Sequence, residues 1–125
     1  MGANAEFWPF KATASVPAFT IVKGTSNAGE AAPATAATDK ILGVSDSIPQ
    51  ASGNMVDVAV EGVHKVVAGA AFDAGDMLTS DSQGRAIRAT FAASTTKYVI
   101  GKALAPAVAA GDIVAFAVFP SIVAG

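Results

Sequence analysis

Short stretches in which apolar residues alternate with other residues, each ended after a few positions by turn-forming residues, constrain the fold of this chain most. In the clearest of them, Val56, Val58 and Val60 occupy alternate positions, the period of two expected of a strand with one buried face. The extended pattern resumes over 63–68, after Glu61–Gly62. This segment therefore predicts two strands joined by a tight turn at Glu61–Gly62.

Further short stretches of this kind recur along the chain. They lie at residues 18–23, 40–46, 77–79, 85–88, 98–104 and 113–119. The residues between them are rich in Ser, Asp, Gly and Pro, which start or close turns. The Ala-rich run 31–38 contains Pro33 and has no apolar stripe, so we expect loop there rather than helix. The pattern predicts an all-β domain of about seven to eight short strands, either a small barrel or a β-tulip or sandwich-like fold.

A turn with the sequence Ala-Gly-Asp occurs twice. Ala74–Asp76 and Ala110–Asp112 each precede an apolar stretch, and Asn27–Glu30 resembles them as a third copy. In such a turn Gly takes the tight conformation, and the acid that follows accepts hydrogen bonds from nearby backbone amides. We expect these acids to form turns rather than a metal or catalytic pair, because no other group that such chemistry needs accompanies them. Ile41–Val44 and Val99–Lys102 also resemble one another.

The composition excludes several classes of protein. Charged residues make up 14% of the chain, the net charge is −2 and the pI is near 5.1, whereas nucleic-acid binding needs a basic surface. A hydrophobic content of 52% with little net charge is the reverse of the composition of disordered chains. Pro106, Gly111–Asp112 and Pro120 interrupt the apolar C-terminal stretch, which argues against a membrane span. We therefore expect neither nucleic acid nor a membrane as a partner.

Residues that carry catalysis are scarce. The chain has no Cys and a single histidine, His64, so a multi-histidine or thiolate zinc site and a Cys–His pair are excluded. It contains no Gly-x-Ser-x-Gly elbow and no glycine-rich phosphate loop. We therefore expect no enzyme activity, no catalytic residue, no cofactor and no metal, with His64 at the surface or at an interface.

The N-terminal segment carries a cluster of aromatic residues. Glu6–Phe10 contains the only Trp and two of the seven Phe of the chain, and such side chains dominate protein interfaces. We expect residues 1–15 to form an extended N-terminal arm before a single β domain of residues 16–125. The partner-binding anchors of this arm are Phe7, Trp8 and Phe10. The alternative is that the segment folds back and covers the core of its own domain.

A series of motifs resembles, in its order along the chain, the capsid cement or head-decoration proteins of tailed phages. The motifs are Gly43-Val44, the Val-Asp-Val-Ala-Val stretch 56–60, Glu61-Gly62-Val63, Ala68–Ala71, Ala74–Asp76, Asp81-x-x-Gly84-Arg85-Ala86, Ile100–Leu104 and Ala110–Val114. The resemblance covers residues 24–120. It implies a small, β-rich, non-enzymatic protein without cofactors.

The resemblance also implies a role in the virion. Such a protein is made in the host cytoplasm, binds the outer surface of the expanded icosahedral head and stabilises it. The major capsid protein would be its partner, reached by a mobile arm that here would be residues 1–15. Closed symmetry is the default for homo-oligomers, and three-fold positions on a shell favour a trimer.

Two other classes of function stay open. One is a small β module that binds a ligand or a carbohydrate, although sugar platforms need aromatic side chains on a rigid face, whereas Trp8 lies in the expected arm. The other is a virion structural subunit that assembles with itself, in a shell or a tail tube. A discrete small oligomer in solution would favour the cement role, and open-ended polymers would favour the tube.

Overall fold

The computed structural model describes residues 5–90 and 96–124, and every regular element in them is a β-strand. The strands are β1 (Glu6–Ala12), β2 (Ile21–Gly24), β3 (Glu30–Pro33), β4 (Ile41–Ser45), β5 (Met55–Val67), β6 (Met77–Ser80), β7 (Ala86–Arg88), β8 (Thr96–Ala103) and β9 (Ile113–Ala124). The predicted all-β fold is confirmed. Within residues 5–90 and 96–124, no helix has the length and apolarity that a membrane span requires.

The first five strands close into a small barrel. Neighbouring strands follow the order β1-β3-β2-β4-β5, and an additional pairing of β1 with β5 closes the ring. The closure is antiparallel and runs from the pair Glu6–Glu61 to the pair Lys11–Met55. We call this unit, which includes residues 55–61 of β5, the first barrel. When a sheet closes on itself, each strand has a neighbour on both sides over the length in which it pairs.

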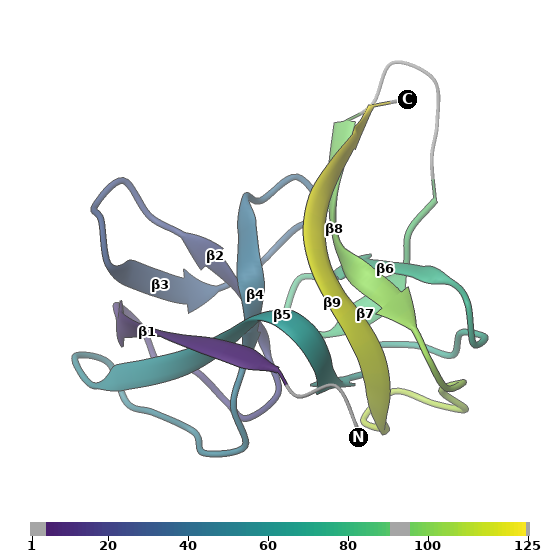
Figure 1. Ribbon diagram of the computed structural model, residues 1–125, viewed down its shortest axis with the longest axis horizontal. Helices are drawn as coiled ribbons and strands as arrows, with labels where there is room; N and C mark the ends of the chain where they lie inside the picture. Colours follow the sequence, from purple (N-terminus) through teal and green to yellow (C-terminus); the bar gives the residue numbers. More distant parts are fainter. Residues whose placement is uncertain (1–4, 91–95, 125) are drawn as a thin grey trace.

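The rest of the chain repeats the topology of the first barrel. Residues 62–67 of β5 pair with β9, and the order continues through β8 and β6 to β7. The parallel contact of β1 with β3 has its counterpart in a parallel bridge between Ala68 and Ala86. We call this part the second unit. Figure 1 shows the two units side by side, with β5 passing from one into the other.

The buried residues of the two units occupy corresponding places. Each residue of the small core cluster inside the first barrel has a buried counterpart in the second unit. The pairs, with the residue of the first barrel first, are Ala12 and Ala68, Val16 and Phe72, Val22 and Leu78, Ala31 and Ala86, Val56 and Val114, and Val58 and Phe116. The larger cluster also takes in Ile21, Val44 and Ala59 from the first barrel. These three side chains therefore pack between the units, and the chain has a core that both units share.

The resemblance of Ile41–Val44 to Val99–Lys102 has a physical cause in this repeat. A Cβ at Gly43 would collide with the carbonyl oxygen of Ala59, and a Cβ at Gly101 would collide with that of Ala117. Both glycines therefore lie where a neighbouring strand comes too close for any side chain.

The structure corrects two predictions in the middle of the chain. The segment read as two strands with a turn at Glu61–Gly62 is the single strand β5, in which Gly62 has a φ of 97°. A register shift in the pairing with β1 lies opposite, between Glu6 and Phe7. The glycine therefore redirects one long strand between the units instead of reversing the chain. Val56 and Val58 are buried as predicted, and Asp57 is exposed.

The strand β3 was also missed. It occupies the start of the run 31–38 that we expected to be loop. Ala and Pro have low strand propensity, and the strand forms because it lies between β1 and β2 in the ring. The N-terminal segment is extended, as expected, and β1 pairs with β5 of the same chain. The division into an arm of residues 1–15 and a domain of residues 16–125 stays a prediction.

Candidate functional site

The three aromatic residues of β1 lie in different surroundings. The side chain of Phe10 packs against the core of the first barrel. Trp8 is 63% exposed and Phe7 is 40% exposed, and the Phe7 ring meets the His64 ring edge-on at 5.3 Å between centroids. Trp8 and Phe7 are therefore accessible to a partner, whereas Phe10 holds the strand to its own domain.

The backbone of β1 is only partly used. The strand pairs with β5 along Glu6–Lys11, but with β3 only at Lys11 and Ala12. The edge of residues 6–10 that faces away from β5 therefore lies outside the β3 pairing. An edge of this kind can receive a further strand from another polypeptide, except that Pro9 has no amide hydrogen to donate.

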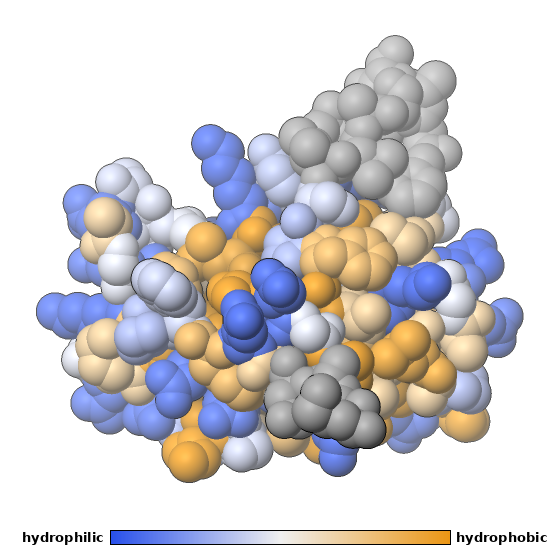
Figure 2. All heavy atoms as spheres, in the orientation of Figure 1, coloured by the Kyte–Doolittle hydropathy of each residue, from blue (hydrophilic) through white to orange (hydrophobic). Residues whose placement is uncertain are grey.

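Other exposed apolar side chains are spread over the surface. The large ones are Ile48, Met55, Leu104, Val108, Ile113 and Phe119. Figure 2 shows hydrophobic and hydrophilic residues mixed over the face drawn, with hydrophobic residues gathered near its middle. Met55 and Ile113 start the corresponding strands β5 and β9, so each unit presents an apolar side chain at the same place.

His64 joins the two units. Its Nε2 lies 2.9 Å from the carbonyl oxygen of Ser45, which can only accept, so Nε2 carries the proton in this contact. The hydroxyl of Ser45 accepts the amide of Thr20 at 2.9 Å and donates to the carbonyl oxygen of Pro17 at 2.8 Å. His64 is thereby fixed as a bridge from β5 to the end of β4. No group of three or more His, Cys, Asp or Glu that could hold a metal ion occurs in residues 5–90 and 96–124.

The two Ala-Gly-Asp segments are turns, as the sequence predicts. The Asp76 carboxylate accepts the amide of Asp73 at 2.9 Å, and the Asp112 carboxylate accepts the amides of Val108 and Ala109 at 2.9 and 3.2 Å. Gly75 and Gly111 have φ of 93° and 96°. Each of these carboxylates therefore accepts hydrogen bonds from backbone amides of its own loop.

The suggested third copy differs. In Asn27–Glu30 the carboxylate of Glu30 accepts side-chain hydrogen bonds from Thr25 and Asn27. The positions that correspond to Gly111-Asp112 and to Gly75-Asp76 in the first barrel are instead Gly53-Asn54 and Phe19-Thr20. Gly53 donates to the carbonyl of Ala12, as Gly111 does to that of Ala68.

Phe19 is the functional candidate that sequence reasoning missed. Its φ is 53°, and it is the non-glycine residue with positive φ in the described part of the chain. A bulky residue in this conformation is an outlier. Aligning Ala18–Thr20 with Ala74–Asp76 would have revealed it, because Phe19 then falls on Gly75.

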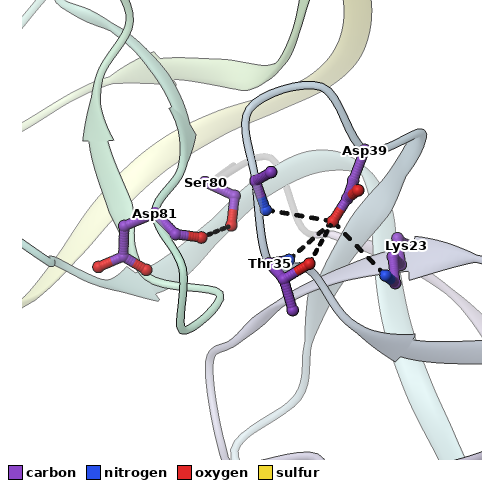
Figure 3. A network of polar contacts seen from close by, with 6 residues as sticks. Lys23, Thr35, Asp39, Ser80 and Asp81 are labelled. Atoms are coloured by element: carbon purple, nitrogen blue, oxygen red, sulfur yellow. Dashed lines mark hydrogen bonds and ion pairs between the residues drawn. The ribbon is translucent and has the colours of Figure 1, made fainter.

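A polar network fixes the loop between β3 and β4. The Asp39 carboxylate accepts the amide of Thr35 at 2.7 Å and that of Ala36 at 3.2 Å, and it lies 3.7 Å from the ammonium group of Lys23 (Figure 3). Burial favours the neutral form of Asp39, but these hydrogen bonds and the charge of Lys23 outweigh it and hold the pKa of the carboxyl below its ordinary value. In the same loop, the carbonyl oxygen of Ala37 accepts a hydrogen bond from the amide of Tyr98 in β8. The network therefore also supports the contact between the units.

Comparison with known proteins identifies the family. The model of a phage cement protein family matches residues 8–118, which is most of the chain. The chain belongs to the phage cement protein family. No curated protein matches the sequence.

A solved structure supports the fold of this family member. The crystal structure of the head fiber gp8.5 N base of bacteriophage phi29 superposes with a TM-score of 0.64 at 22% identity, over 92% of this chain and 94% of the other. At this identity the likeness shows a common fold, and it extends over both units. The family match begins at Trp8 and so includes most of β1.

Proposed function

We propose that the protein decorates the outer surface of the expanded phage head, where it binds the major capsid protein and stabilises the shell without catalytic activity. Membership in the cement family supports a structural role at the capsid. The observation that carries the attachment site is the 63% exposure of Trp8 in a strand that pairs with its own domain. A large aromatic side chain held on a rigid strand loses little entropy on binding.

The candidate anchors take different roles in this proposal. Trp8 and Phe7 contact the capsid, while Phe10 keeps β1 in place. The edge of residues 6–10 that faces away from β5 adds main-chain hydrogen bonds to an extended capsid segment, except at Pro9, which has no amide hydrogen. A trimer is the favoured oligomer, because three-fold positions on a shell match three-fold symmetry in the ligand. The protein is made in the host cytoplasm before it joins the virion.

The test uses expanded shells that lack decoration. The protein is mixed with them, and co-sedimentation measures the bound fraction, with heat resistance of the shells as a second readout. Trp8→Ala should weaken binding by about tenfold or more, since a tryptophan that is a hot spot of an interface contributes about 2 kcal/mol, while the melting temperature hardly changes. Phe119→Ala serves as the control, because Phe119 is also an exposed aromatic residue, at 41%, but lies on β9. Equal loss in both variants, or none in either, contradicts the site.

A further inference from the structure

A pocket opens where the two units meet. None of the proposed anchors Phe7, Trp8 and Phe10 lines it. It has a volume of about 330 Å³. Phe19 and Asp46 line it from the first barrel, Val63, His64 and Lys65 from β5, and Ala115 from β9. Ser47 also lines it from the first barrel, and the surface of the pocket is mostly apolar, with one acidic and one basic side chain. Ligand pockets are commonly of this size and commonly lie at such junctions.

The pocket is built at a cost in backbone strain. Phe19 occupies the positive-φ position where the corresponding turn of the second unit has Gly75. Two backbone hydrogen bonds hold it there, from its amide to the carbonyl of Asp46 at 3.1 Å and from the amide of Val67 to its carbonyl at 3.0 Å. Residues strained in this way are common at binding sites.

The strain places an aromatic ring against His64. The Phe19 and His64 rings are 5.5 Å apart and inclined by 51°. His64 is fixed in turn by Ser45 and by the edge of Phe7. The wall of the pocket is therefore formed before any ligand arrives, which lowers the entropy lost on binding.

We propose that this pocket receives one apolar or aromatic side chain of an extended segment of the capsid protein. The proposal rests on the proposed attachment to the shell and names a second contact for it. Phe7, one of the two proposed capsid contacts, also touches the His64 wall of the pocket, so a capsid segment that packs on Phe7 reaches the pocket beside it. Asp46 and Lys65 provide one charge of each sign for polar groups that flank the inserted side chain.

The decisive variant fills the pocket without removing any of its walls. In Ala115→Trp the new side chain occupies the volume, and binding to undecorated shells should fall by about tenfold or more. Ala28→Trp, in the exposed turn between β2 and β3, is the matched control and should bind like the parent. If Ala115→Trp binds shells as tightly as the parent and the control do, the pocket is not part of the interface and the inference is wrong, although the proposed function stands.

A second measurement decides the case in which the parent does not bind shells. The isolated protein is titrated with N-acetyl-phenylalaninamide, and amide chemical shifts are followed by NMR. Saturable shifts at Val63, Lys65 and Ala115 that disappear in Ala115→Trp support the pocket as a receptor for an apolar side chain. No shift, or stronger shifts with a hexose such as galactose, overturns it. The proposed function and the pocket are in this way tested separately.

Discussion

At the scale of single residues, the glycines of β4 and β8 show how closely the strands approach. A Cβ at Gly43 would collide with the carbonyl oxygen of Ala59, and this contact involves backbone that cannot move without disturbing β5. We expect Gly43→Ala to lower the free energy of unfolding by about 1–3 kcal/mol, as overpacking does. Denaturant unfolding measures the change.

Gly24 provides a control for this substitution. It lies in β2, and a Cβ there would meet only the Leu42 side chain, at 3.7 Å or more. Gly24→Ala should therefore change the stability by no more than about 0.5 kcal/mol. Equal effects of the two substitutions would mean that the close approach of β4 to β5 is not what requires Gly43.

At the scale of elements, the loop between β3 and β4 depends on an ionised carboxylate. The pKa of Asp39 is lowered in the folded protein, so ionised Asp39 stabilises the fold above its unfolded pKa of about 3.9, and this contribution is lost as the pH falls through the lower folded pKa. Asp39→Asn should therefore be less stable than the parent at pH 7 and at pH 5. The difference between them should shrink towards pH 3.

Denaturant unfolding at the three pH values tests this. Asp57→Asn is the control, because Asp57 lies on the exposed side of β5 and its loss should leave the stability nearly unchanged at pH 7. A difference between Asp39→Asn and the parent that stays constant from pH 7 to pH 3 would show that ionised Asp39 is not responsible.

The strand β1 closes the first barrel by pairing with β5, so its removal should destabilise the domain. Deletion of residues 1–11 leaves residues 55–61 of β5 without a partner on one side and removes Phe10, which is half-buried against the core of the first barrel. Losing the backbone hydrogen bonds of a whole strand together with this apolar contact should lower the melting temperature strongly. A synthetic peptide of residues 1–12 should restore part of it. A truncated protein that melts like the parent would instead mark the segment as an arm independent of the domain.

At the scale of the whole molecule, the two units share one core and one strand. Ile21 and Val44 of the first barrel belong to the same buried cluster as Leu78 and Phe116 of the second unit. We therefore expect calorimetry to give a single transition whose calorimetric and van't Hoff enthalpies agree. Two separate transitions would show that the units unfold independently.

The oligomeric state also belongs to this scale. A trimer in sedimentation velocity would agree with the proposed three-fold position on the shell. Open-ended polymers would favour the tail-tube or shell subunit that the sequence left as an alternative. Polymers would leave the fold as described but replace the proposed function.

The sequence by itself determined the class of fold, most strand positions and the Ala-Gly-Asp turns, because these depend on local patterns. The alternation of Val56 and Val58 depends only on one face of a single strand being buried. A Gly-Asp turn depends only on hydrogen bonds from backbone amides of the same turn to the Asp carboxylate. The exposed position of Trp8 agrees with its expected role as an anchor, and that role itself stays a prediction.

Only the tertiary structure decided what depends on distant partners. Whether Gly62 reverses or redirects the chain depends on β1 and β9, which pair with the two parts of β5. The strand β3 has a composition that does not favour a strand and forms because β1 and β2 lie on either side of it. Phe19 is held at positive φ by Asp46 and Val67. Hydrogen bonds between residues far apart in the chain outweigh local preference at each of these places.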